Sequence, residues 1–125
     1  MSASAFSLTA MVPSASFRVR AGEPVPGGVQ GNGLAHFFCP HCKSWMFTRI
    51  DAAPEFVNVR PAMIDDPAWC DPFMETMTSE KLSWARTPAR HSFATFPTMD
   101  ELPGLMEAFA AHLQSIGAGG AADPA

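Results

Sequence analysis

Two cysteines three positions apart, Cys39 and Cys42, are the residues of this sequence best suited to do chemistry. They stand in the run FFCPHCKSWMF, where Pro40 fixes one backbone angle of a tight turn and the spacing aims both sulfurs at a common point. Such a pair is typical of zinc ligands, but a closed tetrahedral site needs four donors. The sequence therefore predicts that Cys39 and Cys42 form half of a zinc site.

Other residues are poor candidates to complete that site. Cys70 is best interpreted as a small, partly buried apolar side chain. His41 lies between the two cysteines, where side chains of a knuckle-type turn generally point away from the metal. His36 precedes Cys39 by three residues on a predicted strand, so strand parity places the two on opposite faces.

A redox function is the alternative for the same pair. The run Cys-Pro-His-Cys matches the active-site turn of the periplasmic thioredoxin-like oxidases, in which a low-pKa thiolate exchanges disulfides. That chemistry needs the first cysteine at the start of a helix, whereas residues 44–50 alternate like a strand and a break follows at 51–54. Two ordinary packed cysteines are the third interpretation of the pair. As a whole, the chain could also be a non-catalytic binding module, either zinc-binding or metal-free.

The elements that must position the pair are predicted to be mainly β. Apolar and aromatic runs at 34–39 and 44–50 flank the turn and predict a hairpin around it. The stretch 21–33 holds five Gly and two Pro, which favours a long exposed loop. Further strands or strand-like pieces are expected at 6–12, 16–20, 55–60, 73–78 and 91–96.

The C-terminal part is the one convincing helix. Its apolar residues recur at helical spacing and form one stripe: Leu102, Leu105, Met106, Phe109, Leu113 and Ile116. Thr98 and Glu101 resemble a capping box, although Pro103 could instead occupy the first turn. Gly117 ends the pattern, so we expect one small domain over residues 1–116 and a disordered tail over 117–125.

Composition excludes several classes of function. The net charge is −4 and the eight Lys and Arg are scattered, so no basic stripe favours nucleic acid. No apolar run approaches the roughly 20 residues that cross a bilayer. The first twelve residues lack the basic start of a secretory signal, and three cysteines make no even disulfide framework. We expect a cytoplasmic protein without nucleic-acid or membrane partners.

Taken together, several segments resemble the glutathione-dependent formaldehyde-activating enzyme family, also called the centromere protein V family. They are SASAFSLTAMVPSASFRVRAGEP, HFFCPHCKSWMFTR, FVNVRPAMIDDP, SEKLSWA and the apolar helix after HSFATFP. The resemblance covers residues 1 to about 116. It implies a small β-tent (Mss-four-like) domain with zinc and a C-terminal helix. It also implies carbon–sulfur lyase activity with glutathione as co-substrate, and a small-molecule thiol adduct as partner.

The resemblance also gives the cysteines their roles. Family members carry an N-terminal Cys-x-Cys, a central Cys-x-Cys-x-x-Cys and a later Cys-x-x-Cys, and only the last is present, as Cys39 and Cys42. In the family this pair joins the N-terminal pair around a structural zinc, while the central triple holds the zinc of the glutathione chemistry. A stretch like residues 2–6 follows the triple directly, so we expect Met1 to be an internal residue, and no catalytic residue can be named. Lys43 departs from the many zinc knuckles that carry glycine there.

Four arginines are candidates for binding an anionic tripeptide such as glutathione. Arg18, Arg20, Arg49 and Arg60 fall at alternating positions of predicted strands. Exposed strand faces bear arginine routinely, so the pattern alone does not choose among them.

Overall fold

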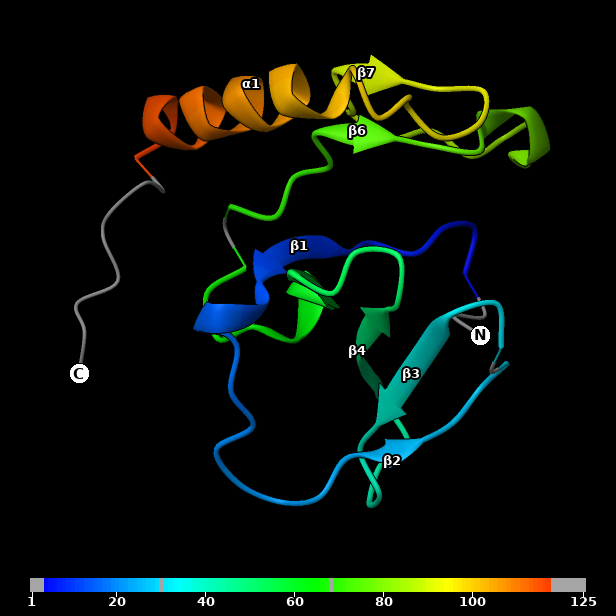
Figure 1. Cartoon of the computed structure of the whole chain (residues 1–125). Helices are drawn as coiled ribbons and strands as arrows, with labels where there is room; N and C mark the ends of the chain where they lie inside the picture. Colours follow the sequence, from blue (N-terminus) through cyan, green and yellow to red (C-terminus); the bar gives the residue numbers. More distant parts are fainter. Residues whose placement is uncertain (1–3, 30, 68, 118–125) are drawn as a thin grey trace. The chain divides into compact units, whose positions relative to one another are not determined.

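The computed structural model describes residues 4–29, 31–67 and 69–117. The chain forms two compact units, unit 1 at Met1–Pro67 and unit 2 at Ala68–Ala125 (Figure 1). Unit 1 holds the large sheet and the cysteine pair, and unit 2 holds two short strands and the helix. The mainly β class with a C-terminal helix is therefore confirmed. The predicted tail lies, from residue 118 onward, outside the described residues.

Unit 1 is built on a five-stranded antiparallel sheet in the order β1-β5-β4-β3-β2. Its strands are β1 (Ala10–Pro13), β2 (Val25–Pro26), β3 (Leu34–Phe38), β4 (Trp45–Ile50) and β5 (Phe56–Val59). The predicted hairpin around the cysteines is confirmed as β3 and β4, which occupy the middle of the sheet with β5. The cysteine turn is thus anchored on the best-paired strands of the unit.

One face of this sheet carries the apolar core of unit 1. Phe37, Phe47 and Val59 face one another across β3, β4 and β5. The ring centroids of Phe37 and Phe17 each lie 4.8 Å from the ring centroid of Phe47. Val57, on the same face of the sheet, is fully buried. Because side chains alternate along a strand, the residues between these point to the opposite face.

The N-terminal strands differ from their prediction. β1 starts later than expected, and no strand forms at 16–20. Pro13 has no N–H to continue the ladder, and Ser14 instead bonds the β4–β5 connection, with its amide 2.8 Å from Glu55 O and its hydroxyl 2.8 Å from Pro54 O. A short 3-10 helix, Ser14–Ser16, follows. Residues 16–20 alternate apolar and polar side chains, but they pair with no strand. Their pattern instead places Phe17 against the core, in contact with Phe47.

The predicted loop at 21–33 is partly recruited to the sheet. Val25 and Pro26 pair with Phe38 and Phe37 at the edge of β3. Gly27 continues this contact, since its amide lies 3.1 Å from His36 O. A Cβ at Gly27 would come within 2.7 Å of the Phe38 ring, so glycine permits the close approach.

Unit 2 contains a short parallel pair, β6 (Met74–Glu75) and β7 (His91–Ser92). The predicted strands at 73–78 and 91–96 are thus reduced to two residues each. Met77 adopts a left-handed conformation (φ 57°) that ends the first strand, and a 3-10 helix, Thr78–Glu80, follows it. Further backbone bonds, such as Phe93 N to Glu75 O at 2.9 Å, extend the contact irregularly.

The helix α1 (Leu102–Ser115) confirms the C-terminal prediction. The Glu101 carboxylate accepts hydrogen bonds from the Thr98 amide at 2.7 Å and the Thr98 hydroxyl at 2.9 Å, so the capping-box residues do meet. The helix nevertheless begins at Leu102, with Pro103 in its first turn. Phe109 packs at 5.2 Å from the ring centroid of Phe73. Gly117, at φ 71°, ends the helix as expected.

Candidate functional site

The turn that carries Cys39 and Cys42 is closed by its own backbone. Cys39 donates its amide to Ser44 O at 2.9 Å, and Lys43 donates its amide to Cys39 O at 3.0 Å. Lys43 lies in the left-handed region at φ 61°, the conformation for which zinc knuckles use glycine. Its ammonium bonds Pro40 O at 2.5 Å. The turn therefore keeps a knuckle-like backbone although the residue there is not glycine.

Hydrogen bonds around Cys42 favour its thiolate. Cys42 is exposed, and its Sγ lies 3.2 Å from Ser44 Oγ. Bonds from the Ser44 side chain and backbone, and from the Cys39 thiol, lower the pKa of Cys42 to about 7. A thiolate is the form of cysteine that attacks electrophiles and binds metals. The pair is chemically suited to either function.

As a zinc site, the pair supplies half of what is needed. Two thiolates on one turn fit two corners of a tetrahedron, the ligand type and spacing that zinc prefers. Within residues 4–29, 31–67 and 69–117, no group of three His, Cys, Asp or Glu side chains could hold a metal ion. The described residues therefore fit a half site and not a closed one.

The other predicted candidates lie elsewhere. His36 is buried, with Nδ1 at 2.8 Å from Thr48 Oγ1 and its ring 5.1 Å from that of Trp45. His41 is exposed, and Cys70 is half-buried and belongs to unit 2. None of the three forms a metal-binding group with the pair in the part of the chain that the structure describes.

The surroundings of the pair differ from those of a thioredoxin-like site. Cys39 follows strand β3 directly, and β4 starts at Trp45. The prediction of a strand after the cysteines is confirmed, so no helix dipole stabilises the first thiolate. The residue with the low pKa is Cys42, and the main cause is its hydrogen bonding with Ser44, two residues away. The sequence shows that a serine is present there, but it does not show that the serine contacts the thiol.

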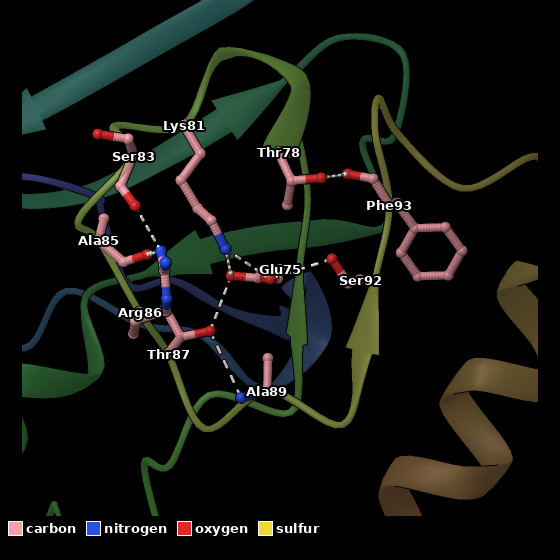
Figure 2. Close-up of polar contacts among 10 residues, drawn as sticks. All are labelled: Glu75, Thr78, Lys81, Ser83, Ala85, Arg86, Thr87, Ala89, Ser92 and Phe93. Carbon is pink, nitrogen blue, oxygen red and sulfur yellow. Dashed lines mark hydrogen bonds and ion pairs between the residues drawn. The ribbon is translucent and has the colours of Figure 1, made fainter.

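A polar cluster in unit 2 was not predicted. The Glu75 carboxylate accepts bonds from Lys81 Nζ at 3.0 and 3.1 Å, from Thr87 Oγ1 at 2.8 Å and from Ser92 Oγ at 3.0 Å (Figure 2). These bonds, that from Lys81 foremost, lower the pKa of Glu75. An ionised carboxylate whose oxygens are already occupied holds β6 and β7 together and is a poor catalytic base. No local pattern marks this cluster in the sequence, because the donors to Glu75 lie 6 to 17 residues away from it.

Among the described residues, no helix is long and apolar enough to cross a membrane. No curated protein and no solved structure matches the chain. The model of the family described as glutathione-dependent formaldehyde-activating enzyme matches residues 1–80, a stretch that includes the Cys39–Cys42 turn and all five strands of unit 1. The chain therefore belongs to the glutathione-dependent formaldehyde-activating enzyme family.

Proposed function

We propose that the protein takes part in carbon–sulfur lyase chemistry on glutathione adducts of formaldehyde, with Cys39 and Cys42 as zinc ligands. In this reaction the thiol sulfur adds to the carbonyl carbon of formaldehyde, and the thiol proton ends on the former carbonyl oxygen. The reverse step breaks the same carbon–sulfur bond. The observation that carries the proposal is a family match that contains a closed turn with two free thiols.

The metal-binding part rests on the turn itself. The pKa of Cys42 is about 7, so at pH 7 about half of its thiols are already deprotonated. Loss of the proton from Cys42 therefore opposes metal binding only weakly at this pH. By resemblance to the family the pair belongs to the structural zinc, so metal there would stabilise the turn and would not by itself establish activity. Zinc as a family cofactor supplies Lewis-acid polarisation and a thiolate in reactive form. We assign no catalytic residue to the chain.

Metal analysis tests the ligand assignment. The purified chain is loaded with Zn²⁺, dialysed and analysed for metal, alongside Cys39→Ser/Cys42→Ser and the matched control Cys70→Ser. We expect zinc in the parent chain and in Cys70→Ser, and its loss in the double variant. A zinc content near zero that the double substitution leaves unchanged would refute the assignment.

Lyase chemistry has a separate readout. Exchange between ¹³C-formaldehyde and its glutathione adduct can be followed by NMR with and without the protein. We expect exchange faster than the uncatalysed background. Exchange at the background rate, together with bound zinc, would identify the chain as a non-catalytic zinc-binding module.

The low pKa of Cys42 also favours the redox alternative, a thiol–disulfide oxidoreductase using Cys39 and Cys42. A disulfide-exchange assay separates it from the leading proposal. Turnover that requires both cysteines and persists without zinc would support it. The free thiols of Cys39 and Cys42 also suit a reducing compartment, in keeping with a proposed cytoplasmic location.

A further inference from the structure

The two cysteines of the turn differ in exposure and in how firmly they are held. Cys39 is half-buried and follows β3 directly, and its backbone amide donates to Ser44 O at 2.9 Å. Cys42 is exposed and lies in the connection between β3 and β4. A dissolved reagent therefore reaches the sulfur of Cys42 more easily than that of Cys39.

The two sulfurs are also placed to react with each other. The Cys39 thiol hydrogen-bonds to the sulfur of Cys42, and both cysteines are free. The Lys43 amide donates to Cys39 O at 3.0 Å, so the backbone closes the turn around the pair. Two cysteines form a disulfide without backbone movement only where the fold already brings them together. The turn meets that requirement.

Neighbouring groups favour attack by Cys42. In thiol–disulfide exchange the attacking sulfur is negatively charged. Ser44 Oγ lies 3.2 Å from Cys42 Sγ, and its hydroxyl can donate to that charge. The Lys43 ammonium, which bonds Pro40 O at 2.5 Å, adds a positive charge to the same turn. Exposure and hydrogen bonding thus single out the same cysteine.

We propose that the turn is a redox switch in which Cys42 attacks a small disulfide, Cys39 resolves the product, and the closed disulfide releases zinc. The order reverses that of thioredoxin-like sites, in which the first cysteine attacks from a helix N-terminus. The output is the metal state of the turn and not catalytic turnover. The zinc step rests on the proposed function, whereas the order of attack does not.

The oxidant is the small disulfide itself, written RSSR. The Cys42 sulfur bonds one sulfur of RSSR, the S–S bond of RSSR breaks, and one RSH leaves with the Cys42 proton. Cys39 then bonds the Cys42 sulfur, the mixed S–S bond breaks, and a second RSH leaves with the Cys39 proton. Both cysteines are oxidised while RSSR is reduced. Because zinc binds thiolates, the oxidised turn has no sulfur ligand left for it.

The order of attack is tested on zinc-free protein with hydroxyethyl disulfide, a neutral reagent. All samples carry Cys70→Ser, and mass spectrometry follows the products. Cys39→Ser should trap the reagent on Cys42, because no thiol remains to displace it. Cys42→Ser should leave a single turn thiol, Cys39, that reacts about tenfold more slowly. With both cysteines present, the mixed disulfide should be transient and the internal disulfide should accumulate.

Two further measurements keep the test decisive if a cysteine variant fails to fold. Peptide mapping of the parent chain at early times locates the first mixed disulfide without any substitution. Ser44→Ala keeps the backbone carbonyl that Cys39 bonds and removes only the hydroxyl, and should slow modification of Cys42 about two- to fivefold. Ser115→Ala, whose hydroxyl bonds His112 O in α1, is the matched control and should not.

Zinc-loaded protein tests the switch itself. A chromogenic zinc chelator reports the free metal while hydroxyethyl disulfide is added. We expect zinc release to keep pace with formation of the Cys39–Cys42 disulfide, and dithiothreitol to restore zinc binding.

Three results would overturn the inference: a first mixed disulfide on Cys39, a mixed disulfide on Cys42 that Cys39 does not displace, or zinc retained after the internal disulfide has formed. A parent chain that never holds zinc would instead refute the proposed zinc site. The zinc-free experiments would then still decide the order of attack.

Discussion

His36 shows how the fold decides the charge of a single residue. The indole of Trp45 can only donate, so Thr48 Oγ1 accepts its proton and can donate its own hydroxyl proton to His36 Nδ1. This arrangement suits a neutral imidazole. Burial acts in the same direction, because it lowers the pKa of His36 below its ordinary value of 6.5.

We therefore expect acid to destabilise the fold through His36. Near and below pH 6.5 the unfolded chain takes up a proton at this residue more readily than the folded chain, so the free energy of unfolding falls as the pH falls below 6.5. Urea unfolding between about pH 7.5 and about pH 5.5 measures the slope. His36→Gln should flatten it, whereas the exposed His41→Gln should not. An equal slope in the parent chain and His36→Gln would contradict the assignment.

Among elements, the sequence predicted those with a strong local period. The hairpin of β3 and β4 and the helix α1 each carry their own periodic pattern, and both are present. The failures depend on distant partners. After β1 the chain leaves the strand because Ser14 hydrogen-bonds Pro54, 40 residues away. Strand β6 pairs with β7, which follows it only after a long connection. Neither contact leaves a local signal in the sequence.

The cysteine turn gives a prediction at the scale of the element. Lys43 is held at φ 61°, which costs a non-glycine residue roughly 1–2 kcal/mol, while glycine loses about 0.5–1 kcal/mol more backbone entropy on folding. Lys43→Gly should therefore be more stable than Lys43→Ala by about 1 kcal/mol. Thermal or urea unfolding of both variants measures the difference.

A helical position supplies the control for Lys43. Gly104 lies in α1 without a positive φ, and a Cβ there meets nothing within 4 Å. Gly104→Ala should thus stabilise the protein by about 0.5–1 kcal/mol, the reverse of the preference at residue 43. Alanine equal to or better than glycine at both positions would show that the turn is not strained.

At the scale of the whole molecule, little apolar volume is fully buried. Among the described residues the buried hydrophobic side chains are Phe47, Val57 and Ala85, together with the fully buried Pro61. In contrast, Trp84, Phe96 and Met99 are 69%, 70% and 79% exposed. The candidate site follows the same division between what sequence can and cannot give. Spacing located the Cys39–Cys42 pair, but the contact with Ser44 that lowers the pKa of Cys42 is visible only in the folded turn.

Such a small core makes Phe47 decisive for stability. Phe47 is 6% exposed and contacts the Phe17 and Phe37 rings, so Phe47→Ala removes a packed ring and leaves a cavity, at a cost of about 3–5 kcal/mol. A domain typically has about 5–15 kcal/mol in total, so this one change takes a large share of it. Phe96→Ala makes the same chemical change at an exposed site and should cost less than about 0.5 kcal/mol. Urea unfolding of both variants measures the difference in stability.

Zinc retention gives a second comparison of the same variants. The Cys39–Cys42 turn joins β3 and β4, and Phe47 packs between these strands and their neighbours. Zinc retention should therefore fall with Phe47→Ala and not with Phe96→Ala. Equal losses from both substitutions would mean that the Phe96 ring is covered in solution and that the core extends beyond the residues buried here.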